Sequence, residues 1–273
     1  MKKVITILSL VVLVGGAAIA YFMNGTARIL IDKHLLGKMD PPPPAVIEPE
    51  RWVYVLADGT GSTNTTYAIP KVTKEWLSEM LTTMYQQTGG KLFLSHIDKD
   101  SRNNQVLYLA VPKQISIDQE PIRESGEVSF DFQKRLTKWR ESVSTAQKDS
   151  IATAKEFQLR KQEFLTAADE FLNTKVYIKS PDNNWTDVIG ILNASFITLE
   201  NDNTSKAKKY VVGFSDFVQD APHLKSMKLD SIPVSVQLMA VNPVQNSSRK
   251  ITDQVTEYEH PNRVTEIIFQ TLK

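Results

Sequence analysis

The chain has 273 residues, and its 32 basic and 31 acidic side chains leave a formal net charge of +1. This balance gives no electrostatic basis for binding nucleic acid, which needs clustered Lys and Arg. The chain has no cysteine, so disulfides, thiolate metal sites, a cysteine nucleophile and the lipid-bearing cysteine of a bacterial lipoprotein are excluded.

Residues 1–23 predict export. Two lysines precede an uncharged apolar run, residues 4–23. As a membrane anchor, this run has the length of a bilayer core of about 30 Å. As a signal peptide, it would end in the A-x-A pattern at Ala18–Ala20. We expect a bacterial cell-envelope protein, anchored in the inner membrane and facing the periplasm or exterior, or periplasmic or secreted if residues 1–20 are cleaved.

Residues 24–50 predict a tether. A short amphipathic helix within residues 24–40 is followed by four consecutive prolines, Pro41–Pro44. Such a run prefers the extended polyproline II conformation and cannot form helix or sheet. We interpret residues 39–50 as a stiff spacer.

Residues 51–273 predict one α/β domain. Continuous runs of β-branched and aromatic residues predict strands, and apolar residues spaced three and four apart predict helices. In chain order these are a strand at 52–57, a helix at 68–87, strands at 91–97 and 104–112, a long helical segment at 129–173, a short strand at 175–180, a helix at 186–201, strands at 208–216 and 232–243, and a helix at 263–272. This alternation predicts a mainly parallel, Rossmann-like sheet covered by helices on both faces.

The sequence allows more specific predictions for two segments. Asn103–Asn104 indicates a tight turn, so the strands on either side should pair as an antiparallel hairpin. Residues 129–173 contain neither Gly nor Pro and repeat apolar residues near a seven-residue spacing, which predicts one long helix or a helical hairpin. We interpret about 113–175 as a helical insertion that either packs on the sheet or projects toward a partner.

Two predicted strands end in an acid: "VYVLAD" at Asp58 and "YVVGFSD" at Asp216. Sites in open parallel sheets form at the carboxyl ends of strands. Thr60 and Ser62 follow the first acid, and Thr186 precedes a predicted helix. All five side chains carry hard oxygen donors, which suit a small cation such as Mg²⁺.

The motifs "DGTGS", "WTDVIGIL" and "FSD" resemble, in order and context, the split metal-ion-dependent adhesion site of von Willebrand factor type A domains. The resemblance spans roughly residues 51–273, with about 113–175 as the insertion. It implies Mg²⁺, Mn²⁺ or Ca²⁺ anchored by Asp58 and coordinated by Ser62. Thr60 and Asp216 would act directly or through water, and Thr186 would join or leave the coordination shell as ligand binds.

By this resemblance, the protein would be a membrane-tethered interaction module rather than an enzyme, and the cation would bridge to an acidic residue of a partner protein. The sequence departs from the family pattern at three positions. Thr60 stands where Ser is usual, Trp185 precedes Thr186 where a small residue is common, and Phe217 follows Asp216 where Gly is common.

Other interpretations remain open. The Asp58–Ser62 loop could belong to a nucleotide- or phosphate-handling enzyme, although no P-loop lysine follows. Asp58 could instead cap an ordinary turn, leaving a scaffold with a dead site. The haloacid dehalogenase signature is excluded because Leu56 stands at the nucleophile position. Asp98 and Asp100 in "SHIDKDSRNN" look calcium-like but lack the remainder of an EF-hand loop, so we expect a solvated turn there.

Overall fold

The computed structural model describes residues 48–59, 69–116, 119–123, 126–178, 186–201, 206–218, 229, 231–242 and 254–270. They belong to one of the two units of the chain, Glu48–Lys273. The apolar segment at 4–23 and most of the predicted tether lie outside these ranges. Within the described ranges, no helix is both long and apolar enough to cross a membrane.

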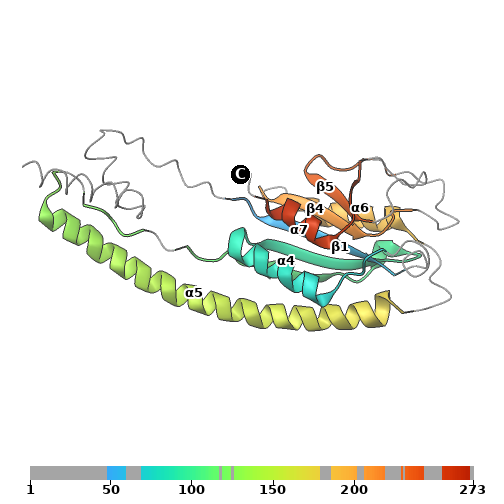
Figure 1. The fold of residues 1–273 in the computed structure, drawn as a ribbon, viewed down its shortest axis with the longest axis horizontal. Helices are drawn as coiled ribbons and strands as arrows, with labels where there is room; N and C mark the ends of the chain where they lie inside the picture. The colour runs from blue at the N-terminus through green and yellow to red at the C-terminus, as the bar shows by residue number, and fades with distance from the viewer. Residues whose placement is uncertain are drawn as a thin grey trace, which may run out of the picture. The chain divides into compact units, whose positions relative to one another are not determined.

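A six-stranded sheet forms the centre of the unit (Figure 1). Its strands are β1 (Arg51–Asp58), β2 (Gly90–Ile97), β3 (Leu107–Val111), β4 (Lys208–Phe214), β5 (Val236–Val241) and β6 (Thr256–Tyr258). They lie in the order β3-β2-β1-β4-β5-β6, and every neighbouring pair is parallel except β2 and β3. The structure therefore confirms the α/β class, the mainly parallel sheet and the antiparallel pairing of β2 with β3.

Helices cover both faces of this sheet, as predicted. They are α4 (Lys74–Gln87), α5 (Ser129–Phe171), α6 (Val188–Glu200) and α7 (Pro261–Phe269), with a 3₁₀ turn, η1 (Ser101–Asn103), and a π-helical turn, η2 (Leu172–Val176). Alternate residues of β1 separate the two cores. Val53 and Val55 pack toward α4, α5 and α7, whereas Tyr54 and Leu56 pack toward α6.

The region predicted as one helix or a hairpin is one helix of 43 residues that continues into η2. Its C-terminal part packs in the core through Phe157, Phe164 and Phe171. Its N-terminal part contributes no residue to either core cluster, and Figure 1 shows it extending past α4. The helix thus packs on the sheet in one half and projects in the other.

Several predicted boundaries are wrong. The short strand expected at 175–180 does not form at its described residues, because the chain continues from α5 as η2 and buries Leu172 and Val176. The helix expected at 68–87 begins only at Lys74, where Thr73 caps it by accepting the Trp76 N–H. The β2–β3 connection contains η1 rather than a two-residue turn. The three-residue β6 was not predicted.

Candidate functional site

The ends of β1 and β4 meet at the point where the chain changes direction across the sheet. From β1 the chain proceeds to β2 and β3 on one side, and it later returns to β4 on the other side of β1. β1 and β4 are parallel neighbours in which Ala57 lies opposite Phe214. Asp58 and Asp216 therefore follow adjacent strand ends, where open α/β sheets bind their ligands.

Asp58 is held by a side chain that the sequence analysis missed. The Ser215 hydroxyl donates to Asp58 Oδ2 at 2.7 Å, and the two residues are 0% and 1% exposed. Ser215 Oγ also accepts the Phe217 N–H at 3.1 Å. The contact depends on the register of the two strands, because pairing Ala57 with Phe214 places Asp58 beside Ser215.

The side chains of Asp216 and Thr186 both form hydrogen bonds with the backbone of Val218. Asp216, half-buried, accepts the Val218 N–H on Oδ1 at 3.1 Å. Thr186, which is buried, donates its hydroxyl to the Val218 carbonyl at 2.9 Å. Three of the five predicted site residues thus lie around the turn at residues 215–218. Thr60 and Ser62 lie outside the described residues, as does Trp185.

The N-terminal end of α6 lies at the same edge. Asp187 caps the helix, because its Oδ1 accepts the Gly190 N–H at 2.9 Å and its Oδ2 accepts the Ser101 N–H at 3.3 Å. A phosphate site at a helix N-terminus needs such N–H groups to be available. Here a carboxylate of the chain already occupies the Gly190 N–H, which favours a cation over a phosphate at this edge.

The end of α5 forms a wall beside the site. Gly59 passes so close to η2 that a Cβ there would lie 1.9 Å from the carbonyl oxygen of Val176. The hydroxyl of Tyr177 accepts the Val72 N–H at 2.7 Å. Burial raises the pKa of Tyr177 strongly, the Val72 N–H opposes this, and the negative charge of Asp58 adds to the rise. Tyr177 therefore stays protonated near neutral pH. Sequence reasoning missed this wall because it predicted a strand there.

The calcium-like stretch after β2 forms an internally bonded turn. Asp98 Oδ2 lies 3.3 Å from His96 Nε2, and its Oδ1 accepts the Asp100 N–H at 3.0 Å. Burial acts to raise the pKa of Asp98, but His96, the Asp100 N–H and Asn104 together bring that pKa below its usual value. The backbone carbonyl of Asp98 also accepts the Asp187 N–H at 2.7 Å, which joins this turn to α6.

Oxygen atoms are the donors at the β1–β4 edge. Asp58 and Asp216 supply carboxylates, and Thr186 and Ser215 supply hydroxyls, a set that fits a hard cation and gives no reason to expect a softer metal. Across the described residues, no three His, Asp or Glu side chains form a group able to hold a metal ion. A cation at this edge would therefore depend on hydroxyl ligands as well as on the two carboxylates.

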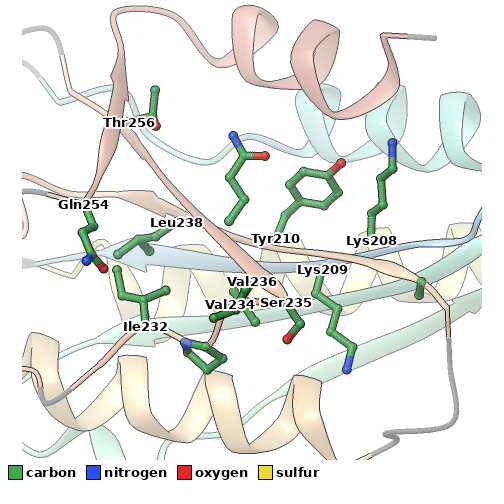
Figure 2. Close-up of a pocket in the computed structure, with 13 residues that line it drawn as sticks. Lys208, Lys209, Tyr210, Ile232, Val234, Ser235, Val236, Leu238, Gln254 and Thr256 are labelled. Atoms are coloured by element: carbon green, nitrogen blue, oxygen red, sulfur yellow. The ribbon is translucent and has the colours of Figure 1, made fainter. Parts of the chain in front are cut away.

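A separate cavity of about 600 Å³ lies at the opposite edge of the sheet, around the starts of β4 and β5 (Figure 2). Lys209, Ser235 and Gln254 supply polar groups to its lining, and Ile232 and Leu238 supply apolar ones. The described lining includes no carboxylate and no imidazole. None of the predicted site residues lines it.

No protein-family description matches the chain, and no curated protein matches it in sequence. The geometry of the β1–β4 edge is therefore the basis for inferring its function.

Proposed function

We propose that Glu48–Lys273 is a von Willebrand factor A-type module. It would bind a divalent cation at the ends of β1 and β4 and, through that cation, an acidic side chain of a partner protein. The observation that carries the proposal is the convergence of Asp58, Thr186 and Asp216 on the turn at residues 215–218. The role we assign is recognition, without catalysis.

The sheet supports this proposal. Its order, β3-β2-β1-β4-β5-β6, is that of doubly wound α/β folds, whose ligands bind where the strand order reverses. In this chain the reversal falls between β1 and β4. Of the residues that the adhesion-site resemblance selects, the three that the structure describes, Asp58, Thr186 and Asp216, lie at this end of the sheet. Their local motifs do not specify which strands become neighbours.

The chemistry of the donors supports a cation. Asp58 and Asp216 would hold Mg²⁺, or Mn²⁺ or Ca²⁺, with Thr186, and Thr60 and Ser62 would add two hydroxyls from the loop after β1. Hydroxyl ligands add no negative charge, so a bound cation keeps an affinity for one more carboxylate from outside. Ser215 orients Asp58 through Oδ2. The cation would supply the open coordination position that a partner's Asp or Glu enters.

The N-terminal sequence supports a place for this module in the cell envelope. The uncharged run at 4–23 would anchor it in the inner membrane, facing the periplasm or exterior, unless residues 1–20 are cleaved. The proline-rich residues 39–50 would hold it away from the bilayer. The partner would then be a protein met outside the cytoplasm.

Calorimetric titration of Mg²⁺ and Mn²⁺ into the unit Glu48–Lys273 tests the proposal. We expect saturable binding that Asp58→Ala abolishes. The matched control is Asp149→Ala, which removes an exposed carboxylate from α5. Binding that survives Asp58→Ala would place the cation elsewhere. An absence of binding at millimolar metal would favour a scaffold with a dead site.

A further inference from the structure

Phe217, the residue after Asp216, has an unusual conformation. Its φ is 53°, and it is the one non-glycine residue of the described ranges with a positive φ. Bulky side chains rarely occupy this left-handed region, where glycine is favoured. Phe217 therefore has a backbone conformation that favours glycine, although it carries a large side chain. Glycine is common at this position in von Willebrand factor type A domains, which the chain resembles.

The ring of Phe217 is buried against Gly213 of β4. Phe217 is 1% exposed and belongs to the core on the α6 side of the sheet. A Cβ built on Gly213 would lie 2.2 Å from Cζ of the ring and 2.7 Å from Cε2. The ring thus occupies space that exists only because residue 213 has no side chain.

The backbone of Phe217 lies between the groups of the candidate site. Its N–H donates to Ser215 Oγ, which donates in turn to Asp58. The next residue, Val218, bonds Asp216 through its N–H and Thr186 through its carbonyl. Any rotation of the backbone at Phe217 would change the distances among these groups.

We propose that the contact between Phe217 and Gly213 is the anchor that fixes the turn at residues 215–218 and so sets the cation affinity of the site. Phe217 is a positioning residue that touches no proposed ligand with its side chain. This inference rests on the proposed function. It explains why a phenylalanine can replace the expected glycine, since the buried ring selects one backbone conformation where a glycine would permit several.

The test is a double-mutant cycle in the full-length chain, solubilised in detergent, with Mn²⁺ alone as the probe. Mn²⁺ affinity is measured by electron paramagnetic resonance, and folding is checked by thermal unfolding of each variant. The cycle uses Phe217→Gly, Gly213→Ala and the two together.

Phe217→Leu keeps an apolar anchor and serves as the conservative variant. Phe157→Ala is the control, because this ring is as buried, at 2% exposed, but stacks on Tyr85 away from the site.

We expect Phe217→Gly and Gly213→Ala each to weaken Mn²⁺ binding about tenfold, a size typical of coupled contacts. Their double variant should lose no more than either alone, because the added methyl group has no ring to displace. Phe217→Leu should retain affinity within about threefold. Phe157→Ala should lower the unfolding temperature without changing Mn²⁺ affinity.

Two results would overturn the inference while leaving the proposed function intact. One is wild-type Mn²⁺ affinity in folded Phe217→Gly. The other is a double variant whose fold-loss of Mn²⁺ affinity equals the product of the losses in the two single variants. If Phe217→Gly does not fold, wild-type affinity in Gly213→Ala overturns the inference by itself. A wild-type chain without saturable Mn²⁺ binding would overturn the proposed function, and this inference with it.

Discussion

The Ser215 hydroxyl donates a 2.7 Å hydrogen bond to Asp58 Oδ2, joining the ends of two parallel strands that lie 157 residues apart in sequence. Ser215 Oγ also accepts the Phe217 N–H, so the hydroxyl proton is directed to the carboxylate. The orientation of Asp58 is therefore fixed by β4 as well as by its own strand. This contact links the stability of the sheet edge to the geometry of the proposed cation site.

Removing that hydroxyl should destabilise the fold measurably. Ser215→Ala leaves the buried carboxylate of Asp58 without one of its donors, and hydrogen bonds to charged groups contribute about 1.5–3 kcal/mol. We expect a loss of that order in the free energy of unfolding, measured by urea denaturation. Ser142→Ala removes an exposed hydroxyl on α5, bonded to the Trp139 carbonyl, and should cost less than about 0.5 kcal/mol. Equal losses in the two variants would contradict the account.

Adding a methyl group at Gly59 should displace η2. The new Cβ would lie 1.9 Å from the backbone carbonyl oxygen of Val176, which cannot move as a flexible side-chain end could. Overpacking of this kind costs about 1–3 kcal/mol. We expect Gly59→Ala to lower the free energy of unfolding by that amount and to increase amide exchange at Val176. Unchanged exchange at Val176 would show that Gly59 and η2 are not in contact.

Tyr177→Phe tests how the end of α5 contacts the segment before α4. The variant keeps the ring, over which Lys71 Nζ lies at 4.8 Å, but removes the acceptor of the Val72 N–H. We expect a loss of about 1 kcal/mol and faster exchange of the Val72 amide. The control is Tyr108→Phe, which removes the hydroxyl of a half-exposed tyrosine in β3 and should leave the Val72 amide protected. If the Val72 amide stays protected from exchange in Tyr177→Phe, the hydrogen bond from the Val72 N–H to the Tyr177 hydroxyl is contradicted.

Asp98 should make stability depend on acid pH. Its folded pKa lies below the usual value of 3.8, so the unfolded chain binds the proton more readily. Its stabilising contribution is therefore complete above the unfolded pKa and is lost as pH falls through the folded pKa. The difference in unfolding free energy between wild type and Asp98→Asn should be larger at pH 7 than at pH 2.5, measured by urea denaturation. A difference independent of pH would contradict this.

The strands β1, β2 and β4 could be predicted because their residues are buried on both faces, which produces continuous apolar runs. The strand β6 could not, since Thr256–Tyr258 is short and only partly buried. The false strand at 175–180 was predicted from the β-branched and aromatic residues Val176, Tyr177 and Ile178, of which Val176 instead ends η2. Tertiary burial of Val176 outweighed its local preference there.

The positions of some residues in the candidate site could be predicted for a similar reason. The acids Asp58 and Asp216 stand out because each follows an apolar strand, and Thr186 stands out because a helix follows it. The contacts of Ser215 and Phe217 were not predictable, because they depend on the register between β1 and β4 and on the space above Gly213. Neither the register between β1 and β4 nor the space above Gly213 can be read from the local sequence.

Mn²⁺-induced broadening of backbone amide signals tests most directly whether a divalent cation binds where β1 and β4 end. At substoichiometric Mn²⁺, we expect selective broadening of Asp58–Gly59, Thr186–Asp187 and Ser215–Val218, with no comparable effect in Asp58→Ala. Broadening centred on Asp98–Asp100, on the cavity around β4 and β5, or at no position up to millimolar Mn²⁺ would contradict the claim.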